Sequence, residues 1–171
     1  MPWWWPFKKR VFKKLETEAD CVEAVRALVV LSIQQSSMGQ LGAIAQCGRV
    51  IQLLKGEVEA KPADEFYLRA FNELLGKPEI VVPAMCHVLL NVVGPEKGWA
   101  TLLLQQIGKP AAPEVARRLA EAGGDMRTHL IGVLEKIGDP GTKGVLETVA
   151  KETGKVGEAA RGALERMNAP A

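Results

Sequence analysis

Apolar residues recur at intervals of three and four along most of the chain, which is the spacing of amphipathic helices. The first helix is predicted over residues 17–35, where Thr17 is followed by Asp20 in an approximate capping pattern. Its apolar residues fall on more than one face, because Val30 and Leu31 lie beside the main stripe. We therefore expect this helix to be covered on both sides, by a neighbouring helix and by the residues that precede it.

The next two predicted helices each have an inward and an outward face. One covers residues 38–54, and the glycines inside it would allow close packing against a neighbour. Its expected inner residues are Leu41, Ile44, Ala45, Val50 and Leu53. The other covers residues 65–75 after a cap at Asp64, with Tyr67 and Arg69 expected to face outward. Its expected inner residues are Phe66, Leu68, Phe71, Leu74 and Leu75.

A short motif punctuates the chain at nearly regular intervals. It reads Leu75-Gly76-Lys77-Pro78, then Ile107-Gly108-Lys109-Pro110, then Ile137-Gly138-Asp139-Pro140, with spacings of 32 and 30 residues. The pattern predicts first helices over 79–93, 112–122 and 142–152, and second helices over 96–107, 125–137 and 155–167. Two helices per period of about thirty residues are typical of an α-solenoid. The sequence thus predicts an all-α fold, an α-solenoid of about four to five stacked helix pairs.

The sequence from Met126-Arg127 to Leu134-Glu135-Lys136-Ile137-Gly138-Asp139-Pro140 resembles the HEAT-like repeat of the phycobilin-lyase type. The resemblance is closest over residues 107–167, weaker over 76–106 and weakest over 17–75. It implies a right-handed stack of helix pairs with a concave and a convex face. The last unit departs from the family pattern, because Gly157 or Glu158 stands where an arginine is expected.

Residues 1–16 form a predicted N-terminal arm, and residues 17–171 form the predicted repeat domain. Three of the four tryptophans lie within the first five residues, between two prolines that disfavour a helix there. Five cations and no acid occur in residues 1–14. The residues predicted to bind a membrane or a partner are Trp3, Trp4, Trp5, Phe7, Lys8, Lys9, Arg10, Lys13 and Lys14.

The segment from Pro2 to Phe7, with the basic residues after it, resembles the tryptophan-rich antimicrobial peptides of the tritrpticin type. The resemblance implies indoles inserted at a membrane interface and cations held by anionic lipid. Indole rings prefer the headgroup level, and an aromatic wedge with a polybasic patch supplies the two signals that reversible anchoring needs. Three interpretations stay open: a membrane anchor, a plug into a partner protein, or an arm folded back over the first helix pair.

Charge and cysteine content exclude several classes of protein. The net charge is +2, and residues 15–171 carry −3, so the helical body is not a nucleic-acid binder by charge. The arm alone would give only modest, salt-sensitive and non-specific affinity for nucleic acid. The three cysteines are far apart within apolar patterns, which predicts buried core residues in a reducing compartment rather than disulfides. No apolar run approaches the length of about 18 residues that spans a bilayer.

Candidate chemistry is sparse. Neither His87 nor His129 is followed by a glutamate, which excludes the iron-dependent hydroxylases built on HEAT-like repeats. Cys86 and His87 are adjacent, so on a helix they point about 100° apart and are poorly placed to share a metal ion. Trp99 is expected to pack in the core rather than to stack on a ligand. The sequence predicts no metal, no cofactor and no catalytic residue.

The leading hypothesis is a non-enzymatic interaction scaffold, an accessory or assembly subunit of a membrane-associated complex. Its helical surface would bind a protein partner, and its arm would dock on an anionic membrane or on the membrane complex. We expect it to be cytoplasmic and peripheral at the inner face of the membrane. The alternative is a phycobilin-lyase-like factor that binds a chromophore and a client protein, an expectation that rests on the resemblance alone.

Overall fold

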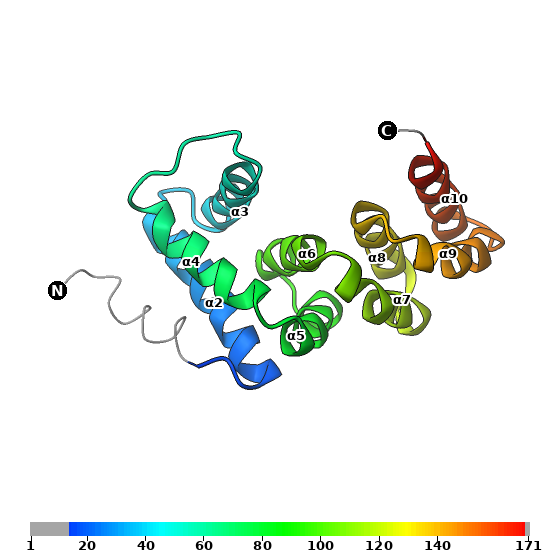
Figure 1. The fold of residues 1–171 in the computed structure, drawn as a ribbon, viewed down its shortest axis with the longest axis horizontal. Helices are drawn as coiled ribbons and strands as arrows, with labels where there is room; N and C mark the ends of the chain where they lie inside the picture. Colours follow the sequence, from blue (N-terminus) through cyan, green and yellow to red (C-terminus); the bar gives the residue numbers. More distant parts are fainter. Residues whose placement is uncertain (1–13, 170–171) are drawn as a thin grey trace. The chain divides into compact units, whose positions relative to one another are not determined.

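The computed structural model describes residues 14–169, and this part of the chain is all-helical. It contains nine α-helices and two short 3₁₀ helices and no β-strand (Figure 1). The prediction of an all-α fold is therefore confirmed. Within residues 14–169, every helix is too short or too polar to cross a membrane.

The chain divides into two compact units, residues 1–103 and residues 104–171. Helix α6 (Glu96–Ile107) contains the point of division. Each unit has its own buried apolar residues, and the two are described separately below.

The first unit is organised around α2 (Glu18–Gln35). Thr17 caps this helix, because its Oγ1 accepts from the backbone N–H of Asp20 while the Asp20 carboxylate accepts from the backbone N–H of Thr17. The predicted capping pattern is therefore confirmed as a reciprocal capping box. Helices α3 (Gln40–Leu54), α4 (Asp64–Leu75) and α5 (Pro78–Asn91) all pack on α2. These three neighbours account for the burial of α2 on several faces.

The aromatic core of this unit lies between α4 and α6. Trp99 is fully buried, and its ring lies 6.1 Å from that of Tyr67 and 6.4 Å from that of Phe71. The prediction that Trp99 packs in the core is confirmed. The prediction that Tyr67 faces outward is wrong, since this residue is 1% exposed. Its ring packs on Trp99, and its hydroxyl donates to Gln35 Oε1 at 2.6 Å. Both the apolar and the polar part of the side chain therefore have partners inside the protein.

The predicted inner face of α3 is only partly correct, because Val50 is buried and Leu53 is half-buried, as expected, while the other three predicted residues are not. Leu41 and Ile44, expected inside, are 61% and 56% exposed, and Ala45 is exposed as well. The residues that pack inward are small: Gly42, Ala43 and Cys47, together with Val50. At Gly42 a Cβ atom would lie 2.1 Å from the Cβ of Ser36, so the chain after α2 approaches too closely for any other residue. Close packing through small residues leaves the large apolar side chains outside.

The second unit contains two helix pairs of matching plan. Gly108 and Gly138 have φ values of 72° and 68°, conformations that favour glycine. After each comes a 3₁₀ turn, Lys109–Ala111 or Pro140–Thr142, and then a helix pair. The pairs are α7 (Ala112–Glu121) with α8 (Gly124–Ile137), and α9 (Lys143–Ala150) with α10 (Lys155–Asn168). Gly76 differs, because its φ is −71° and α5 follows at Pro78 without a 3₁₀ turn.

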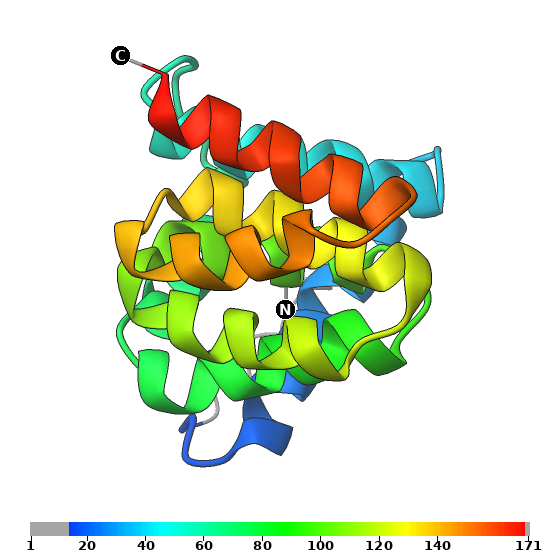
Figure 2. The same ribbon diagram turned by 90° about the vertical axis from the view of Figure 1, so that its right-hand side faces the viewer.

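Packing and ion pairs join the two pairs of the second unit. Figure 2 shows α10 running across α8 and α9, and the two helices are its main neighbours. Arg127 on α8 makes a bidentate ion pair with Glu152 at 2.6 and 2.7 Å. Arg166 on α10 pairs with Glu135 of α8 at 2.6 Å. At matching positions of α8 and α10, Leu130, Val133, Leu134, Ala160 and Ala163 are buried, whereas Ile137, Leu164 and Met167 are half-buried.

Among the glycines of the second unit, Gly157 has the least space for a side chain. A Cβ atom there would lie 1.9 Å from the backbone carbonyl oxygen of Glu152, which cannot move aside as a flexible side chain can. We expect Gly157→Ala to lower the free energy of unfolding by about 1–3 kcal/mol, the usual cost of overpacking. Gly132 in α8 has open space around it, so Gly132→Ala should raise stability by up to about 1 kcal/mol. Urea unfolding of both variants checks this, and equal effects of the two would contradict it.

Candidate functional site

The predicted binding residues of the arm fall almost entirely outside the part of the chain that the structure describes. Lys14 is the exception, with a side chain that is 80% exposed and that forms an ion pair with Glu16 at 2.5 Å. The other members, Trp3, Trp4, Trp5, Phe7, Lys8, Lys9, Arg10 and Lys13, lie before residue 14. Their membrane- or partner-binding role therefore stays a prediction.

The structure does fix the point where the arm leaves the body. Leu15 is 4% exposed, and Lys77 Nζ at the start of α5 donates to the Leu15 carbonyl oxygen at 2.5 Å. Next to this root, Glu16, Glu18 and Glu23 are all exposed. The basic arm therefore emerges from a fixed position whose surroundings carry exposed carboxylates.

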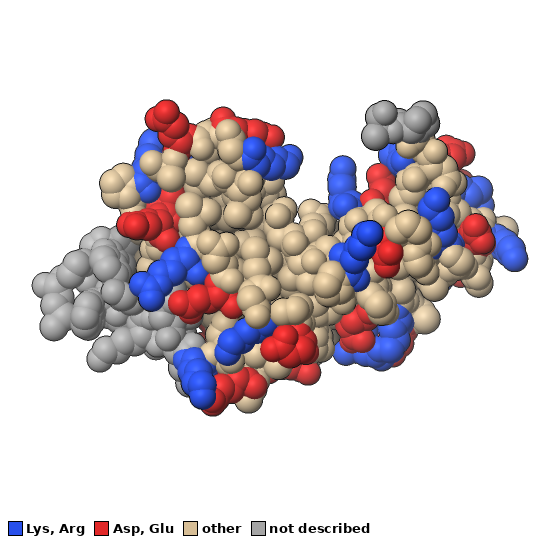
Figure 3. All heavy atoms as spheres, in the orientation of Figure 1, with Lys and Arg blue, Asp and Glu red and all other residues tan. Residues whose placement is uncertain are grey.

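Three of the six exposed large apolar residues of the described chain lie on the outward face of α3 and in the turn before it. Met38, Leu41 and Ile44 are 60%, 61% and 56% exposed, and Gly48 one turn further on has open space where a side chain would stand. We call these four residues the α3 patch. Its neighbours on the outward face, Ala45 and Gln52, are uncharged, and Figure 3 shows a tan surface in this region with charged side chains at its margins. Exposed apolar patches of this kind mark interaction sites more often than chance.

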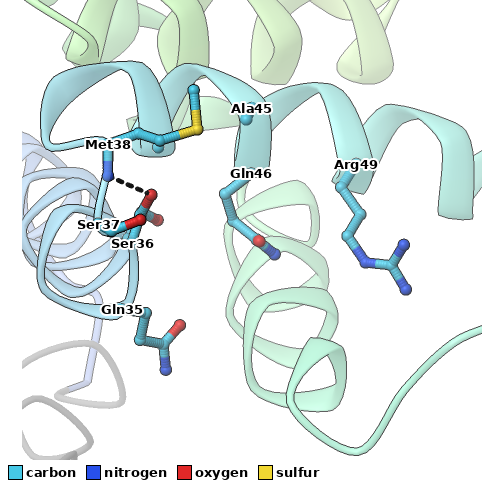
Figure 4. Close-up of a pocket in the computed structure, with 9 residues that line it drawn as sticks. Gln35, Ser36, Ser37, Met38, Ala45, Gln46 and Arg49 are labelled. Atoms are coloured by element: carbon cyan, nitrogen blue, oxygen red, sulfur yellow. Dashed lines mark hydrogen bonds between the residues drawn. The ribbon is translucent and has the colours of Figure 1, made fainter.

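A hollow of about 360 Å³ lies beside the α3 patch, between the end of α2 and α3. Figure 4 shows Gln46 and Arg49 extending from the same side of α3, with Gln35 opposite and Met38 at the edge. Its lining is otherwise Ser32, Ser36, Ser37, Gly42 and Ala45. These groups donate and accept hydrogen bonds, but the lining holds no carboxylate, thiol or imidazole that could act as a nucleophile or general base.

An ion pair between Arg49 and Asp64 fixes the far wall of this hollow. Arg49 Nε and Nη2 donate to the two carboxylate oxygens at 2.7 and 2.6 Å, and the backbone N–H of Lys61 donates to Asp64 at 2.8 Å. Arg49 also donates to the Glu59 carbonyl oxygen at 3.2 Å. The hydrogen bond from Arg49 lowers the pKa of the buried Asp64 carboxyl to about 2. The pair thus ties α3 and the loop that follows it to the start of α4.

Reactive side chains are kept apart. Within residues 14–169, no three or more His, Cys, Asp and Glu residues are grouped so that they could hold a metal ion. Cys86 is buried while the adjacent His87 is exposed, as their spacing on a helix requires. Burial raises the pKa of Cys21 to about 11 and that of Cys47 to about 12, so neither thiol is a ready nucleophile at neutral pH.

Comparison of the chain with protein-family models, with curated proteins and with solved structures finds no match. The function is accordingly inferred from the surfaces described above.

The depressed pKa of Asp64 predicts a pH dependence of stability. A carboxyl whose pKa falls from 3.8 in the unfolded chain to about 2 in the folded one stabilises the fold above pH 4. This contribution, on the order of 2 kcal/mol, is lost as the pH falls toward 2. We expect Asp64→Asn to be destabilised by about this amount at pH 7 and to converge with the parent chain near pH 2. Urea unfolding between pH 2 and pH 7 measures the difference.

Glu57 supplies the matched control for this prediction. Its ion pair with Lys55 is 3.7 Å long and both side chains are more than half exposed, so Glu57→Gln should change stability by less than about 0.5 kcal/mol at any pH. A pH-independent loss in Asp64→Asn would mean that packing, rather than ionisation, is responsible.

Proposed function

We propose that this protein is a non-enzymatic interaction module that its Trp-rich basic arm docks on an anionic membrane surface or on a membrane complex. The observation that carries the proposal is the concentration of three tryptophans and five cations in residues 1–14. Each cation near an anionic surface contributes about 1 kcal/mol, and the indoles supply the apolar part of the two-signal anchor. The fixed root at Leu15 supports it further, because a held root would keep the body close to the docking surface.

We further propose that the body is an α-solenoid of four to five HEAT-like helix pairs. The matching plan of α7–α8 and α9–α10, each preceded by a glycine of positive φ and a 3₁₀ turn, supports this arrangement for the second unit. The ion pair of Arg127 on α8 with Glu152, in the loop after α9, and that of Arg166 on α10 with Glu135 on α8 join the two helix pairs, and contact between neighbouring units is the basis of a stacked array.

A protein partner is the second part of the proposal. The outward face of α7 carries a cluster of ion pairs among Glu114, Arg117, Arg118 and Glu121, which is a well-solvated surface. The α3 patch lacks such charges and is better suited to desolvation. Its exposure supports a role for the first unit in binding, and the proposed setting is the cytoplasmic face of a membrane.

Vesicle co-sedimentation tests the membrane part of the proposal. We expect the full chain to pellet with anionic vesicles, to bind neutral vesicles weakly, and to lose affinity as salt is raised because exposed charges are screened. Changing Lys8, Lys9, Arg10 and Lys13 together to glutamine should weaken anionic binding at least tenfold, since each cation contributes about 1 kcal/mol.

The body offers a control of equal charge. Lys109, Lys136, Lys151 and Lys155 are all exposed, so changing these four to glutamine alters the net charge by the same amount outside the arm. This variant should bind nearly as well as the parent chain. If both variants lose affinity equally, net charge rather than the arm drives binding. If the parent chain does not pellet, the membrane proposal is wrong, and the arm either binds a protein partner or folds back on the body.

A further inference from the structure

The exposed apolar area of the α3 patch limits the kind of segment or partner that can cover it. Its three large side chains expose roughly 300 Å², which is small beside the ~800 Å² that each partner of a stable complex buries. A segment of the same chain can bind while burying less area than this, because its attachment gives it an effective concentration on the order of millimolar. The area of the patch alone therefore favours a segment of this chain over a second copy or a free partner, since a protein partner would have to cover more of the first unit than the α3 patch.

The N-terminal arm is long enough to reach the patch. It leaves the body at Leu15, next to the start of α2, while Met38 follows the end of that helix. The 18 residues of α2 span about 27 Å. The ten residues from Leu15 back to Trp5 extend to about 33 Å at ~3.3 Å per residue. An extended arm that follows α2 would therefore bring its tryptophans to the α3 patch.

Charge along this route matches the arm. The first half of α2 and the two residues before it expose three carboxylates, Glu16, Glu18 and Glu23, and one cation, Arg26, so this part of the route has a net negative charge. Lys8, Lys9, Arg10 and Lys13 lie between the root and the tryptophans. The second half of α2 exposes Val30 and then leads to the uncharged patch. Cations would thus pass carboxylates first, and the indoles would reach the apolar surface.

We propose that the α3 patch is the intramolecular seat of the Trp-rich arm, with Trp3, Trp4 and Trp5 covering Met38, Leu41, Ile44 and the open surface of Gly48. Three observations support this contact: the small area of the α3 patch, the length of the arm compared with that of α2, and the charges exposed along α2. One consequence rests on the proposed function: a seated arm is withheld from the membrane, so vesicles and the α3 patch compete for the same tryptophans.

A contact probe on the patch tests the seat. Gly48→Cys places a thiol on the open face, and a bimane label there is quenched when an indole touches it. The three native cysteines are buried, and burial raises the pKa of Cys21 and Cys47, so labelling is selective for the new thiol. We expect the bimane fluorescence of the labelled full-length protein to be at most about half that of the same protein carrying Trp3→Ala, Trp4→Ala and Trp5→Ala, because the tethered indoles occupy the patch.

Control variants locate the contact. A label at Val93→Cys, a position 93% exposed, should show no such quenching by the arm. Adding Leu41→Lys and Ile44→Lys to the Gly48→Cys protein should relieve the quenching, whereas Val145→Lys should not; circular dichroism checks that each variant is folded. Equal emission with and without the three tryptophans would overturn the seat. Quenching that rises with protein concentration would assign the patch to the arm of a second copy and also overturn the proposal.

Adding anionic vesicles to the labelled protein tests the contact between the arm and the α3 patch independently of membrane docking. Relief of quenching supports the competition. Quenching that persists, in a chain that does not pellet, leaves the seat intact and rejects membrane docking. A chain that pellets without any quenching beforehand rejects the seat and leaves membrane docking intact.

Discussion

The first unit depends on the burial of α2 on several faces at once. Its eight buried residues include Cys21, Leu28 and Leu31, which no single neighbouring helix could cover. Helices α3, α4 and α5 must therefore all pack on it, and α3 can approach closely only through small residues such as Gly42 and Ala43. That choice turns Leu41 and Ile44 to the outside. The exposed α3 patch is a consequence of how α2 is covered, and the protein retains it although the uncovered apolar surface is a liability in water.

Local signals explain what the sequence predicts well. The cap at Thr17, the proline at the start of α5 and the glycines at 108 and 138 act within a few residues, so helix boundaries are readable without the fold. The direction in which a helix faces is a tertiary property. In α3, apolar residues occur at helical spacing on two faces. The pattern alone does not show that the face with the small residues packs against the core. Tyr67 was misplaced for a related reason, because its buried hydroxyl needs Gln35 from another helix.

The candidate site was predictable only in part. Tryptophans and cations crowded into the arm are visible in the sequence, whereas the patch and the hollow appear only when α2 and α3 are packed together. The contrast with the second unit is informative. There, Arg127 pairs with Glu152 in the loop after α9, and Arg166 pairs with Glu135 on α8. The outward face of α7 carries ion pairs among Glu114, Arg117, Arg118 and Glu121. Desolvating the neutral face of α3 costs less free energy than desolvating a charged helix face. This difference makes the first unit the better place to look for a binding surface.

The arm and the α3 patch are two apolar surfaces of one chain, and water penalises the exposure of each. If they meet, the contact must remain reversible for the arm to serve any external partner. Ordering a free segment costs about 1–2 kcal/mol per residue, so a short tryptophan segment on a small patch would be held weakly and released readily. The acidic route beside α2 would supply attraction that salt screens. A larger or more apolar seat would hold the arm permanently, whereas a patch of this modest size would permit the proposed exchange between the body and a membrane.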